Sequence, residues 1–376
     1  MENDDEETHV TVLQLKMKQK HIILITQKDG TATQDRTEQI YRLLKPGYRI
    51  TILDTYKFIR KRMTFLLCSN PNLVFVYGLK NAQFRLKKSH YPIIEAMKLR
   101  ADALVHDILS LKPDCVICGV EEDMMTLHHP LNDALKIYDL PTPFADEVNY
   151  GGTQPSTIIH ELERIEKTTL VKSHFFCANW MTYTKFLEKK YRVRNSIRAP
   201  SGCETAKRYA RFKGNPEIAF VGNLDGYWTN LPLLQNLCKI SNFPINIYGP
   251  KRRPHIKLPY KGYLKKHSHL ADYQFGLITI TNDPLRKIGF SAKHLLYVSY
   301  GLPVLCPIWR QDKTLEPATI YYNKHNFNER VRKYCTETLW REKHEAAMRL
   351  ARQMPWRKTL RPLVKRIDEY FQSTTE

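Results

Sequence analysis

The stretch Gly289–Pro307, GFSAKHLLYVSYGLPVLCP, decides the fold class of this chain of 376 residues. Its first half has the apolar spacing of a short amphipathic helix, with Lys293 in the first turn. Gly-Leu-Pro then leads into the apolar run Val304–Pro307, which predicts a short strand. The N-terminus of a helix carries unpaired N–H groups and partial positive charge, so a lysine there raises the question of which anion it meets.

Strand-like and helix-like segments alternate on both sides of this stretch, which predicts parallel, doubly wound sheets. In the first half, the predicted strands are His21–Thr26, Tyr48–Asp54, Leu73–Gly78, Asp114–Val120, Thr142–Val148, Leu170–Ser173 and Val193–Ile197. The predicted helices between them are Gln34–Leu44, Tyr91–Leu111, Ser156–Thr168 and Asn179–Tyr191. The polar, basic segment Ala199–Glu217 reads as a linker, after which the alternation restarts.

This pattern predicts four parts: a disordered acidic tail (1–13), an N-terminal Rossmann-like domain (14–200), a C-terminal Rossmann-like domain (201–352) and a closing helix (353–376). Two Rossmann-like domains would face a cleft, where the carboxyl ends of such sheets bind ligands. Pro362 inside the closing helix predicts a kink or a break.

Charge narrows the choice of partners. Lys and Arg total 59 against 38 Asp and Glu, a formal net charge of +21, so the chain must meet something anionic. The stretches Lys57–Leu67 and Leu79–Arg100 mix cations with Phe, Leu, Ile and Met, which suits an anionic membrane surface or a nucleic acid. No segment approaches the length of a membrane-spanning helix, and no signal peptide is recognisable.

The eight cysteines form no disulfide framework. Cys115 and Cys118 have CxxC spacing, but they lie in an apolar, β-branched run without a second pair. We therefore expect buried strand thiols in a reducing cytosol rather than a zinc or redox site.

Five segments follow one another in the C-terminal half: EIAFVGNLDGYWTNLPLL, INIYGP, YKGYLKKHSHLADYQFGL, GFSAKHLLYVSYGLPVLCP and a terminal helix led by Trp356. In order and spacing they resemble the nucleotide-binding domain of GT-B glycosyltransferases. The Ser-x-Lys-x-Leu start at 291–295 and the Gly-Leu-Pro-x-x-Cys-Pro end at 301–307 are similar to those of bacterial exopolysaccharide glucuronosyltransferases of the xanthan type.

The resemblance implies an α/β chain of the GT-B fold: two Rossmann-like, doubly wound parallel-sheet domains facing a cleft. It implies transfer of a sugar from a nucleotide-sugar donor, a UDP-sugar and in the xanthan type UDP-glucuronate, to a lipid-linked or saccharide acceptor in bacterial-type surface polysaccharide synthesis. The nucleotide sugar would be a substrate, with no cofactor and no metal. The expected partners are donor, acceptor and an anionic membrane surface rather than nucleic acid, with the protein cytoplasmic and peripheral on the inner face of the membrane.

Resemblance and physical chemistry agree on the donor site. The candidate donor-binding residues are Gly222, Asn223, Tyr248, Tyr263, Ser291, Ala292 and Lys293. The hydroxyl and backbone at the helix start would meet the diphosphate, and the lysine would offset charge on the leaving nucleoside diphosphate. The glycine lets backbone approach the diphosphate, the asparagine can donate to it, and the tyrosines are candidates for contacts with the base.

The mechanism predicted is inverting. Retaining enzymes of the largest GT-B family carry Glu-x7-Glu across this helix, and Ile288 and Leu296 stand at those positions here. Inversion needs a general base on the acceptor side. Asp146, placed at a predicted strand end, is the first candidate; Asp29 is the second, with Gly30 allowing close approach of the acceptor.

Two other functions fit the same pattern. A nucleotide-sugar epimerase on this fold is the first, although more carboxylates would be expected near the donor motif. A catalytically inactive GT-B-like adaptor for a membrane or nucleic acid is the second, although it would not need Gly222, Ser291 and Lys293 together.

Overall fold

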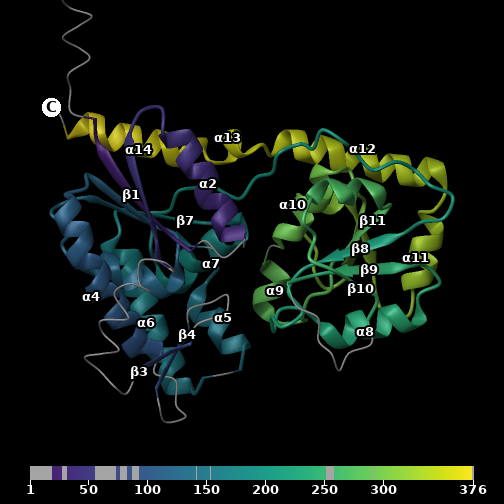
Figure 1. Ribbon diagram of the computed structural model, residues 1–376, viewed down its shortest axis with the longest axis horizontal. Helices are drawn as coiled ribbons and strands as arrows, with labels where there is room; N and C mark the ends of the chain where they lie inside the picture. The colour runs from purple at the N-terminus through teal and green to yellow at the C-terminus, as the bar shows by residue number, and fades with distance from the viewer. Residues whose placement is uncertain are drawn as a thin grey trace, which may run out of the picture. The chain divides into compact units, whose positions relative to one another are not determined.

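The computed structural model describes residues 19–27, 32–55, 73–76, 83–86, 93–140, 142–152, 154–250, 258–289 and 291–374 (Figure 1). The predicted acidic tail and the candidate residues Asp29 and Gly30 lie outside these ranges. Most of the basic stretches Lys57–Leu67 and Leu79–Arg100 lies outside them as well.

The strands are β1 (His21–Thr26), β2 (Arg49–Asp54), β3 (Leu73–Val76), β4 (Gln83–Leu86), β5 (Cys115–Cys118), β6 (Leu135–Leu140), β7 (Phe175–Ala178), β8 (Ile218–Val221), β9 (Ile245–Tyr248), β10 (Tyr260–Gly262), β11 (Phe275–Leu277), β12 (Val304–Pro307) and β13 (Thr319–Tyr322). The α-helices are α2 (Ala32–Leu44), α4 (Ile93–Leu111), α5 (Phe144–Tyr150), α6 (Ser156–Lys172), α7 (Met181–Tyr191), α8 (Leu231–Ile240), α9 (Pro284–Ile288), α10 (Ala292–Ser299), α11 (Phe327–Lys333), α12 (Glu337–Gln353), α13 (Trp356–Thr359) and α14 (Arg361–Ser373). Short 3-10 helices are η1 (Glu121–His128), η2 (His267–Asp272) and η3 (Glu316–Ala318).

The strands form two larger sheets, with orders β2-β1-β5-β6-β7 and β10-β9-β8-β11-β12-β13. The strand pairings with a described register in both sheets are parallel. In the first sheet, β1 lies between β2 and β5, and all six of its residues are buried, which explains the apolar run Ile22–Ile25 at its centre. In the second, β8 and β11 occupy the centre.

By contacts, the chain divides into two compact units, Met1–Asp139 with Thr168–Phe176, and Leu140–Lys167 with Cys177–Glu376. Within the first unit, two buried ion pairs tie helices to the core. Arg36 donates to both carboxylate oxygens of Asp139, at 2.7–2.9 Å, and Arg100 of α4 pairs with Asp123 at 2.7 Å. Paired in this way, the charges can remain in the interior.

Within the second unit, α8 lies on one side of the six-stranded sheet, and α10 and α12 lie on the other (Figure 1). Helix α10 packs on β11 and β12 and against α12. The buried Trp340 of α12 donates from Nε1 to the backbone oxygen of Gln274, at 2.9 Å, just before β11. This contact fixes α12 along the edge of the strands.

The alternation of strands and helices was predicted correctly, but several elements differ. The segment predicted as a strand at Thr142–Val148 is helical, because β6 has already ended at Leu140 and α5 begins at Phe144. Helix α6 continues through Lys172, so the predicted strand Leu170–Ser173 is wrong and the strand follows as β7. The structure assigns no strand to residues 193–197.

A further difference concerns β3, which pairs antiparallel with β4 in a separate two-stranded sheet and so lies outside the parallel sheet. Strands β4, β6 and β13 were not predicted. The break at the end of the chain is confirmed: α13 ends at Thr359, and Pro362 stands in the first turn of α14. Proline is accepted there because the first N–H groups of a helix have no partner within it.

The described cysteines are free thiols, and Cys115, Cys118, Cys177, Cys203 and Cys306 are buried. Burial raises the pKa of the Cys115 and Cys118 thiols well above the ordinary range, which makes both inert at neutral pH. None of the helices in the described part of the chain combines the length and the apolar character that crossing a bilayer requires.

Candidate functional site

Three glycines meet where β8, β9 and β10 end. The N–H of Gly222 donates to the carbonyl of Tyr248 at 2.9 Å, and the N–H of Gly249 donates to the carbonyl of Gly262 at 3.0 Å. A Cβ on Gly249 would lie 2.5 Å from the carbonyl oxygen of Gly222, a backbone atom that has no room to move. These strand ends therefore carry no side chains of their own, which leaves room for a side chain from another element to lie against them.

The side chain of Lys293 lies directly over these strand ends. A Cβ on Gly222 would be 2.4 Å from both Cε and Nζ of Lys293, and the ammonium stands 4.6 Å from the centre of the Phe220 ring. No carboxylate of the described residues lies within ion-pair distance of the ammonium. The predicted residues Gly222 and Lys293 are thus brought together.

Burial lowers the pKa of Lys293 to about 8. The residue is half-buried, with its ammonium packed against Phe220 and Gly222, and the partial loss of water around that group causes the shift. A desolvated cation without a carboxylate partner is destabilising in the unliganded protein. An anionic ligand bound beside the Lys293 ammonium would supply the negative charge that the protein does not.

Helix α10 is fixed to the strands by Tyr297, one turn after Lys293. The buried phenol accepts a hydrogen bond from the N–H of Val221 at 2.9 Å and donates to the carbonyl of Leu277 at 3.1 Å. A Cβ on Gly276 would lie 2.3 Å from the tyrosine ring, so this glycine makes room for it. Residues four apart share a helix face, and Tyr297 therefore holds Lys293 at the strand end.

The first turn of α10 presents its donors beside Lys293. Ser291 is the N-cap residue, and its side chain makes no capping hydrogen bond to the helix. Its carbonyl accepts from the N–H of His294 at 2.8 Å. The Ser291 hydroxyl and the backbone of Ala292 and Lys293 thus stand together at the start of the helix, where partial positive charge gathers.

Asn223 and Tyr248 also lie at these strand ends. The side-chain oxygen of Asn223 accepts from the N–H of Asp225 at 2.9 Å, which closes a local turn and leaves its amide NH₂ as the group able to donate to a ligand. The Tyr248 hydroxyl is bonded to that of Tyr273 at 2.6 Å. Tyr263, just after β10, is 59% exposed. The contacts of both predicted tyrosines with a base remain predictions.

Asp146 does not have the surroundings that the sequence suggested. It lies in α5 and its carboxylate pairs with Lys190 of α7 at 2.7 Å; the same ammonium pairs with Glu163 at 2.8 Å. Burial raises the pKa of Asp146, and the bond to Lys190 opposes that rise. The strand-end placement of Asp146 is therefore wrong, and its carboxylate is bound to a cation within the second unit.

Asp146 and Glu147 are neighbours in helix α5 rather than in a strand. In a helix, consecutive side chains differ by about 100° in direction, and both carboxylates find partners. Glu147 pairs with Arg286 of α9, at 2.5 Å.

Arg286 forms a buried cluster that sequence reasoning missed. Its guanidinium, in a residue that is 7% exposed, donates to Glu147, to the Tyr227 hydroxyl at 2.9 Å and to the Tyr183 hydroxyl at 3.4 Å. The short helix that carries it starts at Asp283, whose carboxylate accepts from the Arg286 N–H at 2.8 Å. Asp-Pro marks that helix start in the sequence, but nothing in the sequence pairs this arginine with a glutamate 139 positions earlier.

No group of three or more histidine, cysteine, aspartate or glutamate side chains suited to a metal ion occurs among the residues that the structure describes.

No protein-family model matches the chain, and no curated protein matches it. Solved structures do match. Sucrose-phosphate synthase from Thermosynechococcus elongatus superposes with a TM-score of 0.67 at 11% identity, over 94% of this chain and 100% of the other. HepE from Anabaena, solved with UDP-glucose, gives 0.63 at 8% identity over 93% and 99%. S. aureus TarM, solved with UDP, gives 0.60 at 8% over 92% and 99%.

Each of these structures aligns over more than nine-tenths of both chains, so the likeness applies to the whole fold. Because the identities are far below 25%, the likeness shows the fold alone. They add no support for a xanthan-type assignment. Two parallel sheets with helices around them, in an order that follows these structures from end to end, give the conclusion: the chain has the GT-B fold of the glycosyltransferases.

Proposed function

We propose that the protein is a glycosyltransferase that uses a UDP-sugar as donor. The observation that carries this proposal is the ammonium of Lys293, packed over Gly222 at the start of α10 with no carboxylate of the described residues to neutralise it. HepE and TarM, which share the fold, were solved with UDP-glucose and with UDP.

In this proposal the diphosphate lies at the carboxyl ends of β8 and β9. The backbone at Gly222 allows close approach, the first N–H groups of α10 and the Ser291 hydroxyl donate to phosphate oxygens, and Lys293 supplies positive charge. As the bond between sugar and phosphate breaks, negative charge grows on the leaving UDP. Lys293 and the helix terminus are already in place to stabilise it, without a metal ion.

The acceptor hydroxyl must lose its proton as it attacks the anomeric carbon, and inversion assigns that proton to a base of the protein. Asp146 remains the first candidate and Asp29 the second. The raised pKa of Asp146 suits a base, but its ion pair with Lys190 would have to loosen before the carboxylate could take a proton.

The remaining parts of the proposal rest on the resemblance to xanthan-type enzymes. These are UDP-glucuronate as donor, a lipid-linked or saccharide acceptor in bacterial-type surface polysaccharide synthesis, and a peripheral position on the inner face of an anionic membrane. The charge of +21 supports the membrane contact.

The test is turnover of a panel of UDP-sugars, with mass spectrometry to detect transfer or hydrolysis and proton NMR to detect epimers, and slow hydrolysis is the reaction expected when no acceptor is present. Lys293→Ala should lower the rate by about 10²–10³-fold, the loss typical of one well-placed electrostatic stabiliser. Release of UDP with an intact sugar supports transfer or hydrolysis. Conversion of the sugar to its epimer would instead assign an epimerase, and no reaction together with no UDP binding would refute the proposal.

A further inference from the structure

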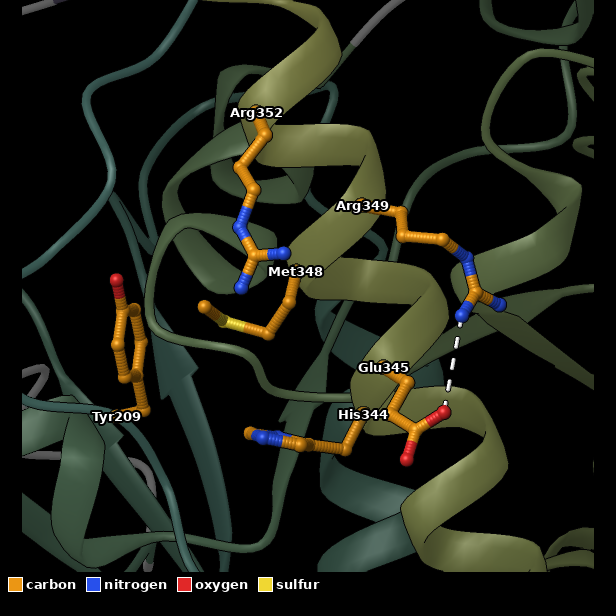
Figure 2. Close-up of a pocket in the computed structure, with 6 residues that line it drawn as sticks. All are labelled: Tyr209, His344, Glu345, Met348, Arg349 and Arg352. Carbon is orange, nitrogen blue, oxygen red and sulfur yellow. Dashed lines mark ion pairs between the residues drawn. The ribbon is translucent and has the colours of Figure 1, made fainter.

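Two adjoining cavities lie along α12, and neither is lined by a candidate donor residue. The larger, of about 430 Å³, is lined by Tyr209, His344, Glu345, Met348, Arg349 and Arg352 (Figure 2). The second, of about 370 Å³, is lined by Glu204, Thr205, Ala351, Arg352, Pro355 and Arg357. Arg352 lines both. A volume near 400 Å³ lies within the range of small-molecule sites, about 300–1,000 Å³.

One face of α12 forms a wall of the larger cavity. His344, Met348 and Arg352 are spaced four residues apart, so they stand in a row along the helix. In Figure 2 all three side chains point to the side where Tyr209 of the linker stands opposite, whereas Glu345 and Arg349 point away. The cavity thus has a histidine at one end, a buried thioether in the middle and a guanidinium at the other end.

The wall opposite is held by backbone hydrogen bonds on both sides of Tyr209. The N–H of Ala206 donates to the carbonyl of Ser299 at 3.0 Å, and the N–H of Ala210 donates to that of Tyr300 at 2.9 Å. These bonds tie the linker to the end of α10. The cavity is therefore built into the fold, and a ligand need not order it first.

His344 is fixed as well. A carbonyl oxygen can only accept, so Nδ1 donates to the carbonyl of Gly301, at 2.7 Å, and Nε2 is left as an acceptor in the neutral ring. The ring stacks on Trp340 at 4.7 Å between ring centres, and burial lowers its pKa, which favours that neutral form. His344 can therefore accept a hydrogen bond from a hydroxyl of a ligand.

The charge of the cavity is carried by Arg352. Arg349 is 3.7 Å from Glu345, the ion pair marked in Figure 2, and Arg341 pairs with Glu337 on the same helix. By contrast, no carboxylate of the described residues lies within ion-pair distance of the Arg352 guanidinium. A guanidinium is a planar fork of donors that matches a phosphate, and it remains charged at every physiological pH.

We propose that this cavity binds a phosphate ester that carries an apolar group, with the phosphate on Arg352 and the apolar group between Tyr209 and Met348. Arg357 in the adjoining cavity adds a second guanidinium, and Glu204 there limits the charge that the phosphate side can hold. Two sources offer this chemistry, a phospholipid headgroup with its acyl chains and a soluble phosphate ester. The site is separate from the donor site and does not depend on the proposed function.

The experiment uses three probes that share a phosphate: phenyl phosphate as the soluble ester, monomeric dihexanoyl phosphatidate as the lipid, and glycerol phosphate, which lacks the apolar group. Affinity is measured by calorimetry. The Met348 methyl resonance, assigned with Met348→Leu, reports whether a probe enters this cavity rather than the donor site. We expect phenyl phosphate, dihexanoyl phosphatidate or both to shift that resonance, and glycerol phosphate to bind more weakly.

Arg352→Ala should weaken binding of those probes by about tenfold or more, since a hydrogen bond to a charged group contributes on this scale. Tyr209→Ala should weaken binding of phenyl phosphate and dihexanoyl phosphatidate and leave the affinity for glycerol phosphate unchanged. Arg341→Ala, an exposed arginine of the same helix outside the cavity, is the matched control and should have no effect. The proposal is overturned if no probe shifts the Met348 resonance, or if Arg341→Ala weakens binding as much as Arg352→Ala. Preference for the phosphatidate over phenyl phosphate would assign the lipid headgroup.

Discussion

Replacement of Lys293 by methionine should make the unliganded protein more stable. Methionine keeps the length of the side chain and removes the charge that is enclosed between Phe220 and Gly222. Burial moves the pKa of this lysine from 10.5 to about 8. One pKa unit corresponds to about 1.4 kcal/mol, which gives about 3 kcal/mol as an upper value, and the partial exposure of the residue reduces it to about 1–2 kcal/mol.

The pH dependence follows from which state holds the proton. Below pH 8 both folded and unfolded chains are protonated at Lys293, so the full penalty is present. Between about pH 8 and 10.5 the unfolded chain holds a proton that the folded protein has lost, so the unfolding free energy of the wild type rises with pH. The advantage of Lys293→Met should therefore be largest at neutral pH and should shrink across this window.

Urea denaturation of both proteins at several pH values, without nucleotide, measures this difference. A Lys293→Met variant that is less stable than the wild type at neutral pH would refute the reasoning. So would an advantage that stays constant from neutral pH to above pH 10, because the lysine would then not be enclosed as described. Such a lysine is costly to the fold, and its retention is explained if a ligand neutralises it.

Three further predictions concern the surroundings of the site. Gly249→Ala should lower the unfolding free energy and weaken UDP binding, because its Cβ would meet a carbonyl oxygen at 2.5 Å, whereas Gly214→Ala, with nothing within 4 Å, is the control that should do neither. Arg286→Leu should lower the unfolding free energy by about 3 kcal/mol, because it leaves the carboxylate of Glu147 without its cation. Adding Glu147→Gln should restore part of that stability. A double variant that is no more stable than Arg286→Leu would argue against the ion pair as the cause. Asp146→Asn should abolish transfer while changing UDP affinity by less than a few fold, and Glu147→Gln should be milder; an active Asp146→Asn would move the base elsewhere.

The strands of the first sheet show what the sequence could predict and what it could not. The four central residues of β1, Ile22–Ile25, are all apolar because the strand is covered on both faces, and this pattern marks a buried parallel strand without help from the rest of the chain. Phe144–Tyr150 mixes apolar and polar residues in a short segment, and its first turn is held by a distant residue. The N–H of Phe144 donates to the buried Glu166, at 2.6 Å, and burial raises the pKa of that carboxyl to about 7. Local pattern contains no trace of such a contact.

In the site, too, local features could be predicted from the sequence and contacts with distant residues could not. Lys293, Ser291 and Gly222 could be predicted because a helix start and a strand end are local features with chemical meaning. Arg286 could not, because its role depends on Glu147 and Tyr227, which the fold brings to it. Nor could the cavity on α12, because the row of His344, Met348 and Arg352 reads like any helix face until Tyr209 stands opposite it.

Calorimetric titration of UDP into the wild type, Lys293→Met and Lys287→Met tests the central claim most directly. Lys287 is an exposed lysine of α9, six positions from Lys293, and serves as the matched control. We expect the wild type and Lys287→Met to bind UDP equally well and Lys293→Met to bind at least about tenfold more weakly, since it loses a charge-assisted contact with the diphosphate. Equal affinity of Lys293→Met and the wild type for UDP would contradict the assignment of the diphosphate to the start of α10.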